Sequence, residues 1–238
     1  MPFKKIFRAT SRLFGYEITR HQRPPISPLL SLNIDLLIDI GANTGQSAIQ
    51  ARHEGYTKQI LSFEPLLDAY ELLCKNSKED SKWAIYKRCA LGSQPTTSCI
   101  NVAGNSGSSS MLDMLPRHIN AAPESRYFST QEIEVITLDS IFDKISQGYK
   151  DIFLKIDTQG YEHEVLAGSI NCLHKIKAIQ LELSTTPLYS SQYLYDYFFD
   201  FFKKNNYLLW DLVPGFKDPE SGELLQFDAL FVRSDVAR

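Results

Sequence analysis

The chain has 238 residues, of which 43% are hydrophobic and 22% are charged. This length fits one large domain or two small ones, and the composition excludes a disordered chain, a collagen-like fibre and a disulfide-stapled scaffold. The 25 basic and 28 acidic side chains give a net charge of −3, which argues against a protein that binds nucleic acid through its overall charge. No apolar run approaches the roughly 18 residues that a membrane helix needs.

The cysteines and the first residues bear on the cellular compartment. The four cysteines are Cys74, Cys89, Cys99 and Cys172, and none lies in a CxxC pair. We therefore expect reduced thiols rather than zinc ligands or a thioredoxin-like motif. The first residues lack an uninterrupted apolar run and a small-residue cleavage site, so they make a poor secretory signal. These features together predict a cytoplasmic protein.

Residues 1–34 differ from the rest of the chain and predict a basic N-terminal helix with a linker. Residues 1–23 carry six basic side chains and one acidic side chain, Glu17, which leaves a net charge of +5. The apolar side chains at roughly helical spacing are Phe3, Ile6, Phe7 and Phe14. Two interpretations are open for this amphipathic helix: it packs on the domain, or residues 1–23 contact an anionic membrane at its inner surface.

From residue 35 onward, short apolar runs alternate with helical patterns. Strands are expected at residues 35–40, 59–63, 83–87, 133–138, 151–156, 178–183, 207–212 and 227–233, and helices at 45–54, 66–78, from about 162, and at 190–206. This alternation predicts an α/β fold with a doubly wound, mostly parallel sheet in a single domain over residues 35–238. The last two strands lack a crossover helix between them, so we expect them to pair antiparallel.

One long segment has no readable period. Residues 93–130 are rich in Ser, Asn, Gly and Pro. Long irregular stretches inside a compact domain are often functional loops or lids. We therefore predict that residues 93–130 form an acceptor loop or lid without regular structure.

The first predicted strand leads into a glycine turn, in the sequence IDIGANTG from Ile38 to Gly45. Gly41 allows a tight turn and close approach of a ligand, and Gly45 opens the next helix. A doubly wound sheet binds nucleotide-like ligands at this place. The spacing is GxxxG rather than GxGxxG, so the backbone clamp that holds a dinucleotide pyrophosphate is not expected here.

An acid follows the second predicted strand. Glu64 lies 23 residues after Gly41, in the sequence FEP. An acid at that place can accept hydrogen bonds from both hydroxyls of a ribose. The glycine turn and Glu64 together describe a nucleoside site without a pyrophosphate clamp, and S-adenosylmethionine fits that description.

Three motifs of the chain are DIGANTG, FEP and LKIDTQGYEHEVLAG. In these motifs the chain resembles the FkbM family of S-adenosylmethionine-dependent methyltransferases, from about Leu36 to Phe231. The resemblance implies a class I methyltransferase fold, a Rossmann-like doubly wound sheet of seven strands, mostly parallel with an antiparallel last strand. It also implies methyl transfer to oxygen, often on a sugar, a glycan or a natural product.

The resemblance assigns site residues one by one. It implies a cofactor site made of Asp39, Gly41, Ala42, Asn43, Gly45, Glu64, Pro65, Ala90 and Asp157. Asp157, Gly160, Glu162 and Gly168 match the third motif. Gln159 stands where many members carry Glu, which removes one carboxylate from the site.

Methyl transfer needs an acceptor oxygen in line with the sulfonium methyl and a route for its proton. Asp157 ends the fourth core strand and is the first candidate for this work, with helix capping as its alternative. Glu162 either reaches the same site or bonds the loop backbone, and Glu182 either lines the acceptor pocket or pairs with a basic group. Asp157 and Glu182 end neighbouring strands. We therefore expect a site without a metal, with Mg²⁺ on these two carboxylates as the weaker alternative.

The acceptor itself is expected to be a small molecule or a glycan, not a nucleic acid. Ser108, Ser109 and Ser110 lie in a serine-rich stretch that resembles one in the same family, and their hydroxyls could hold a polyhydroxylated acceptor. Gln159 and Tyr161 are expected on the same substrate side, and Tyr189 offers a ring on which a sugar could stack. The aromatic helix at 190–206 predicts core packing and the contact face of a homodimer.

Two other functions compete with methyl transfer. A nicotinamide-dependent oxidoreductase would use the same fold, but the GxGxxG loop is missing. A noncatalytic binding module would not need Gly41, Glu64, Asp157 and Glu162, all of which are present. Methyl transfer from S-adenosylmethionine is therefore the function that the sequence favours.

Overall fold

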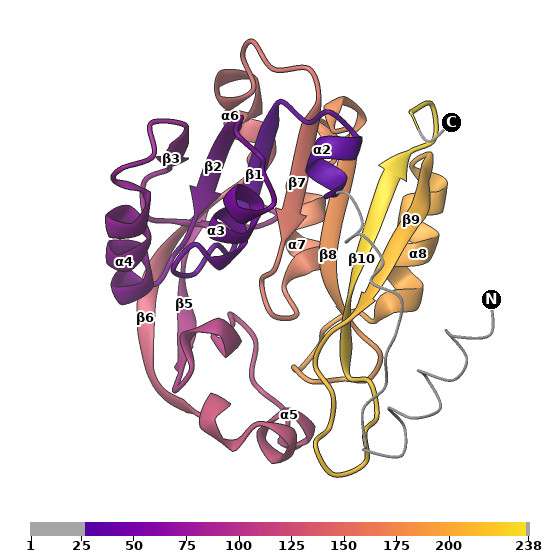
Figure 1. Cartoon of the computed structure of the whole chain (residues 1–238). Coiled ribbons are helices and arrows are strands. Elements are labelled where there is room, and N and C mark those ends of the chain that lie inside the picture. Colours follow the sequence, from indigo (N-terminus) through magenta and orange to yellow (C-terminus); the bar gives the residue numbers. More distant parts are fainter. Residues whose placement is uncertain (1–26, 237–238) are drawn as a thin grey trace, which may run out of the picture.

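A computed structural model describes residues 27–236, which form two sheets with helices around them (Figure 1). The strands are β1 (Leu36–Ile40), β2 (Gln59–Phe63), β3 (Trp83–Ile85), β4 (Ala90–Leu91), β5 (Thr96–Ala103), β6 (Tyr127–Ile136), β7 (Ile152–Ile156), β8 (Ala178–Ser184), β9 (Tyr207–Pro214) and β10 (Gln226–Arg233). The α-helices are α2 (Pro28–Ser31), α3 (Gln46–His53), α4 (Leu67–Ser77), α5 (Pro116–Ala121), α6 (Leu138–Ile145), α7 (Glu162–Ala167) and α8 (Tyr195–Lys204). The predicted basic helix and its membrane contact lie outside the described residues.

The larger sheet has seven strands in the order β3-β2-β1-β7-β8-β10-β9. The strands β3, β2, β1, β7 and β8 run parallel to one another, and β10 runs antiparallel to both β8 and β9. The order reverses at β1, which has β2 on one side and β7 on the other. The predicted doubly wound sheet with an antiparallel last strand is confirmed, and its switch point lies between β1 and β7.

Helices bury the central strands of this sheet on both faces, because alternate side chains of these strands point to opposite faces. On one face, Ile38 and Leu154 belong to a core that includes side chains of α6, α7 and α8. On the other face, Leu37 and Phe153 pack with side chains of α2, α3 and α4. Figure 1 shows α2 and α3 on the near side of the sheet and α8 on the far side. The sheet is therefore the middle layer of three.

The domain begins earlier than the sequence indicated. Residues 27–34 were expected to be linker, but Pro28 starts the short helix α2, where a missing backbone N–H costs nothing. Leu29, Leu32 and Ile34 are buried in the core beneath it. The prediction that the linker reaches residue 34 is therefore wrong.

The interpretation of residues 93–130 as irregular is also wrong. This segment contains β5, α5 and the first residues of β6, and β5 pairs antiparallel with β6 from Thr96 to Ala103. With β4, these strands form a second sheet in the order β4-β6-β5. β6 is also longer than the strand expected at 133–138, and α6, which follows it, was not expected. Figure 1 shows β5 and α5 beyond the ends of β1 and β7, where they cover that edge of the larger sheet.

Other sequence expectations need smaller changes. The aromatic helix α8 starts at Tyr195 rather than at residue 190, because Leu188 and Tyr189 donate their backbone N–H groups to Oε1 of Gln192 in a loop. The four cysteines are free, as expected. Within residues 27–236, no helix is both long and apolar enough to pass through a bilayer.

Candidate active site

A pocket lies where β1, β2 and β7 end, on the side covered by the second sheet. Its lining consists of Ile40, Gly41, Ala42, Asn43, Gln46, Ser47, Phe63, Glu64, Pro65, Leu66, Cys89, Ala90, Leu91, Ile100, Ser106, Gly107, Ser109, Met111, Lys155, Asp157, Thr158, Gln159 and Tyr161. The carboxyl ends of parallel strands meet at one edge, and ligands of doubly wound sheets bind there. The position of the pocket agrees with the site that the sequence indicated.

Gly41 turns the chain sharply after β1. Its φ is +76°, and a Cβ there would lie 1.9 Å from the backbone oxygen of Asp157. Glycine is required because the chain after β1 passes against the chain after β7. Gly45 is also left-handed, with φ +95°, and a Cβ there would meet the ring of Trp83. Gly45 therefore shapes the start of α3 but does not line the pocket, contrary to expectation.

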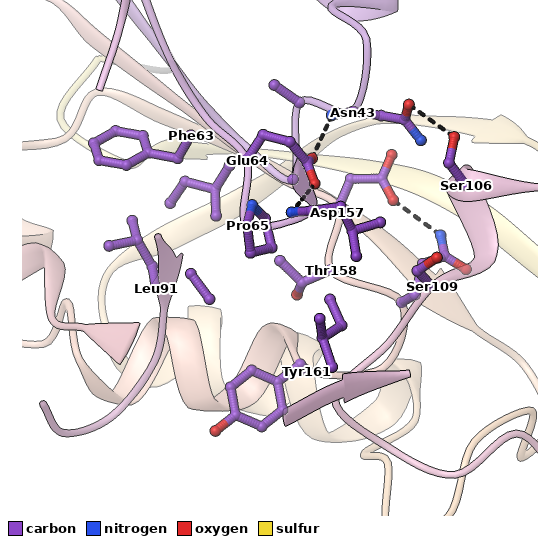
Figure 2. Close-up of a pocket in the computed structure, with 18 of the residues that line it drawn as sticks. Asn43, Phe63, Glu64, Pro65, Leu91, Ser106, Ser109, Asp157, Thr158 and Tyr161 are labelled. Atoms are coloured by element: carbon purple, nitrogen blue, oxygen red, sulfur yellow. Dashed lines mark hydrogen bonds between the residues drawn. The ribbon is translucent and has the colours of Figure 1, made fainter. Parts of the chain in front are cut away.

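Glu64 follows β2 and is buried, with only 4% of its surface exposed. Its carboxylate accepts the backbone N–H of Asn43 at 2.7 Å and that of Leu66 at 2.9 Å (Figure 2). Each oxygen keeps a free lone pair, which can accept a hydroxyl of a ligand in the pocket. Burial raises the pKa of Glu64 to about 7, because a charged carboxylate loses the solvation that water would give it.

The pocket has an apolar part and a polar part. In Figure 2, Phe63, Pro65 and Leu91 lie toward one side, and Asn43 and Ser106 lie toward the other. Ser106 Oγ donates to Oδ1 of Asn43 at 3.0 Å. This hydrogen bond joins the segment that follows β5 to the glycine turn. An apolar slot beside a carboxylate and several hydroxyl and amide groups suits a nucleoside with a polar tail.

Asp157 follows β7 and lines the pocket beside Lys155. Lys155 Nζ lies 2.9 Å from Asp157 Oδ2 and 4.0 Å from Oδ1 of Asp39. Burial alone would lower the pKa of Lys155, but the adjacent Asp157 and Asp39 outweigh it and raise that pKa. Lys155 was not among the predicted site residues, although it is the one charged side chain within the apolar run of β7.

Besides Gly45, three more residues predicted to bind the cofactor or the substrate lie outside the pocket. Asp39 is fully buried in β1 and does not line the cavity, and its assignment to the cofactor site stays a prediction. Burial raises the pKa of Asp39, and Lys155 is its nearest cation. Ser108 and Ser110 do not line the pocket either, whereas Ser109 does.

Glu162 is held inside the turn after β7. Its Oε1 accepts the backbone N–H of Thr158 at 2.9 Å and of Gly160 at 3.2 Å, and also the Thr158 hydroxyl at 3.1 Å. Burial raises the pKa of Glu162 to about 7. Of the two roles left open, the structure shows the bonds to the loop backbone. Glu162 does not line the pocket, and its assignment as a catalytic residue stays a prediction.

Glu182 lies near the end of β8 and does not line the pocket directly. Its Oε2 accepts the amide N–H groups of Gln159 at 2.6 Å and of Gln226 at 2.8 Å. Gln159 also donates to Asp157 Oδ1 at 3.0 Å. Glu182 is therefore linked to the pocket by its hydrogen bond to Gln159. Its hydrogen-bond partners are side-chain amides rather than a basic group. Within residues 27–236, no three His, Cys, Asp or Glu side chains are grouped so that they could hold a metal ion.

Ten of the predicted site residues line the pocket. The pocket is lined by Gly41, Ala42, Asn43, Glu64, Pro65, Ala90, Asp157, Ser109, Gln159 and Tyr161. Sequence reasoning missed most of the apolar lining, which comes from Phe63, Leu66, Leu91, Ile100 and Met111. Phe63 directly precedes Glu64 and could have been inferred, but Ile100 and Met111 come from the segment that was expected to be irregular.

Several solved structures are similar to this chain. The chain resembles a Streptococcus pneumoniae protein described as a tRNA (m1A22) methyltransferase and solved with S-adenosyl-L-methionine. The identity is 10% and the TM-score 0.48, over 84% of this chain and 66% of that chain. It also resembles TehB from Haemophilus influenzae, with 8% identity and a TM-score of 0.48, over 90% of this chain and 63% of that chain. These likenesses are too weak to carry any statement about a substrate. No curated protein with a matching sequence was found.

A family model gives the assignment. The model of the methyltransferase FkbM domain matches residues 39–209, which include the glycine turn, Glu64 and the segment from β7 to α7. The seven-stranded order with an antiparallel β10 is that of class I S-adenosylmethionine-dependent methyltransferases. The chain therefore belongs to the methyltransferase family defined by the FkbM domain.

Proposed function

We propose that the protein transfers the methyl group of S-adenosylmethionine to a hydroxyl of an uncharged, polyhydroxylated acceptor, such as a sugar, a glycan or glycolipid precursor, or a natural product. The observation that carries this proposal is the buried Glu64 carboxylate, which faces a pocket between the glycine turn and Asp157. A ribose-binding acid and an acceptor-side acid then share one cavity.

The residues present fit this cofactor. The apolar slot by Phe63 and Leu91 would hold the adenine, and the free lone pairs of Glu64 would accept the ribose hydroxyls. Asn43 and the glycine turn would face the amino-acid tail. When bound, the cofactor supplies an electrophilic methyl group on a positively charged sulfur.

The acceptor side is built from neutral donors and acceptors. Ser106, Ser109 and Gln159 line it, together with the ring of Tyr161. Lys155 is the one cation in the described lining, and it already pairs with Asp157. An acceptor phosphate or carboxylate would therefore find no unpaired cation there, whereas hydroxyls would find many partners.

Asp157 is placed to orient the acceptor and to receive its proton. In the transfer, the acceptor oxygen forms a bond to the methyl carbon, and the electron pair of the broken C–S bond remains on sulfur. The hydroxyl proton passes to a base, for which Asp157 is the acid in the lining closest to the acceptor groups. Lys155 and Gln159 fix the two oxygens of Asp157, so its orientation does not depend on solvent.

The test is transfer of labelled methyl from S-adenosylmethionine to a panel of sugars, glycolipid precursors and hydroxylated natural products, with RNA included for comparison. Asp157→Asn is expected to reduce transfer at least about tenfold while cofactor affinity changes little, because the asparagine keeps the shape but loses the base. Asp143→Asn, at a carboxylate whose side chain is 87% exposed, is the control and should transfer normally. Labelling of RNA alone, or full activity of Asp157→Asn, would refute the proposed acceptor or the proposed base.

The raised pKa of Glu64 gives a pH-dependent prediction. Ribose hydroxyls favour the ionised carboxylate, so binding weakens where Glu64 is protonated, below its pKa of about 7. The affinity for 5′-methylthioadenosine, which has no group that titrates near neutrality, should fall about tenfold from pH 8 to pH 6 and level off above pH 8. Calorimetry across this range checks it, with Glu64→Gln as the control that should show no slope. The same slope in both proteins would assign the titration to another group.

A further inference from the structure

Gln159 occupies an unusual backbone position in the turn after β7. Its φ is +55°, which side-chain-bearing residues seldom adopt. Ser110 Oγ donates to its carbonyl oxygen at 2.7 Å, which ties the turn to the segment after β5. Backbone strain of this kind persists only where the surroundings hold the residue in place, and it is common at functional sites.

Both the NH₂ group and the oxygen of the Gln159 side-chain amide are hydrogen-bonded. Its Nε2 donates to Asp157 Oδ1 at 3.0 Å and to Glu182 Oε2 at 2.6 Å. Its Oε1 accepts the hydroxyl of Tyr189 at 2.8 Å. Tyr189 was expected to offer a ring to a sugar, but it is fully buried and instead orients this amide. The orientation of the amide is fixed, because only its NH₂ group can donate to two carboxylates.

The surroundings of these two carboxylates are rich in negative charge. Burial raises the pKa of Glu182, and the acids that act on it with like charge are Asp157, Asp228 and Glu162. Asp39 and Glu64 are the other acids that face Asp157, from β1 and from the end of β2. Lys155 is the cation that opposes them, and its ammonium contacts the other oxygen of Asp157. The gap between Asp157 and Glu182 is therefore bridged by a neutral amide.

We propose that Gln159 is a positioning residue whose amide takes the bridging place that a divalent cation would otherwise occupy between Asp157 and Glu182. Two carboxylates at the ends of neighbouring strands are a usual way to hold Mg²⁺ at such a sheet edge. Here the NH₂ group holds both oxygens, so the acceptor-side carboxylates keep their geometry without a metal. The proposal rests on the proposed function only for the role given to Asp157.

The substitution Gln159→Glu tests this most directly. It keeps the length of the side chain and an acceptor for Tyr189, but it replaces the bridging donor with a third carboxylate. Three oxygen ligands at one position should bind a hard divalent cation. Mn²⁺ is the probe, followed by electron paramagnetic resonance in cofactor-free protein. The double variant Gln159→Glu/Glu182→Gln is the matched control, because it restores the original number of carboxylates.

We expect Gln159→Glu to bind Mn²⁺ at least about tenfold more tightly than both the wild type and the double variant. No gain in Mn²⁺ affinity would overturn the proposal. Tight binding of Mn²⁺ by the wild type would also overturn the proposal, if the substitution Glu182→Gln removed that binding. If Gln159→Glu does not fold, this comparison of the wild type with Glu182→Gln tests the proposal by itself. Because no cofactor is present, neither result depends on whether S-adenosylmethionine binds.

Discussion

Replacing Gly41 by alanine should destabilise the protein by at least about 4 kcal/mol or prevent it from folding. The new Cβ would lie 1.9 Å from the backbone oxygen of Asp157, and neither chain can move without disturbing the contact between the ends of β1 and β7. The left-handed φ of +76° adds a strain of about 1–2 kcal/mol. Thermal or urea unfolding of the purified variant measures the loss.

Gly222→Ala separates the overlap from the backbone strain. Gly222 has nearly the same φ, +74°, but no atom lies within 4 Å of the position that a Cβ would take there. Its substitution should therefore cost only the strain of about 1–2 kcal/mol. If the two alanine variants were equally stable, the close approach at Gly41 would not be what requires glycine there.

Glu64→Ala should weaken the binding of S-adenosylmethionine by about 5- to 150-fold, or about 1–3 kcal/mol. The substitution removes an acceptor for the ribose hydroxyls. It also removes the partner of the Asn43 and Leu66 backbone N–H groups, which shape the glycine turn. Calorimetric titration of the two proteins gives the change in affinity.

The direct ribose contact can be separated from the effect on the turn. Adenosine and 2′,3′-dideoxyadenosine differ only in the two hydroxyls that Glu64 is proposed to accept. The wild type should bind adenosine at least about tenfold more tightly, and Glu64→Ala should lose most of that preference. If both proteins preferred adenosine equally, Glu64 would support the turn without contacting the ribose.

The larger sheet could be predicted because its central strands are buried on both faces. β1 and β7 are nearly continuous apolar runs, which is typical of parallel strands between two helical layers. The ends of β1, β2 and β7 also located Gly41, Glu64 and Asp157, since the carboxyl ends of parallel strands meet at one edge.

The second sheet could not be predicted for the opposite reason. Most residues of β5 and β6 are exposed or only partly buried, so polar residues dominate and the alternation is weak. The serines and the glycine after β5 form a short 3₁₀ turn, Ser106–Ser108, rather than a long loop. The pocket residues that this segment supplies, including Ile100 and Met111, were therefore hidden.

Side-chain direction limited the prediction of the site. Asp39 belongs to the DIGANTG motif, but its side chain is fully buried within β1, where Oδ1 lies 4.0 Å from Lys155 Nζ. Glu162 lies in the third motif, but it points into its own turn. Sequence spacing places a residue on an element, whereas these contacts depend on tertiary packing that spacing does not contain.

The central claim is that this pocket binds S-adenosylmethionine as its cofactor. Calorimetric titration of the purified full chain with S-adenosylmethionine, and with NAD⁺ as the comparison, tests it most directly. The account predicts saturable micromolar binding of S-adenosylmethionine and none of NAD⁺, because the glycine turn after β1 has no pyrophosphate clamp. Binding of NAD⁺ in its place, or of neither compound, would contradict the account.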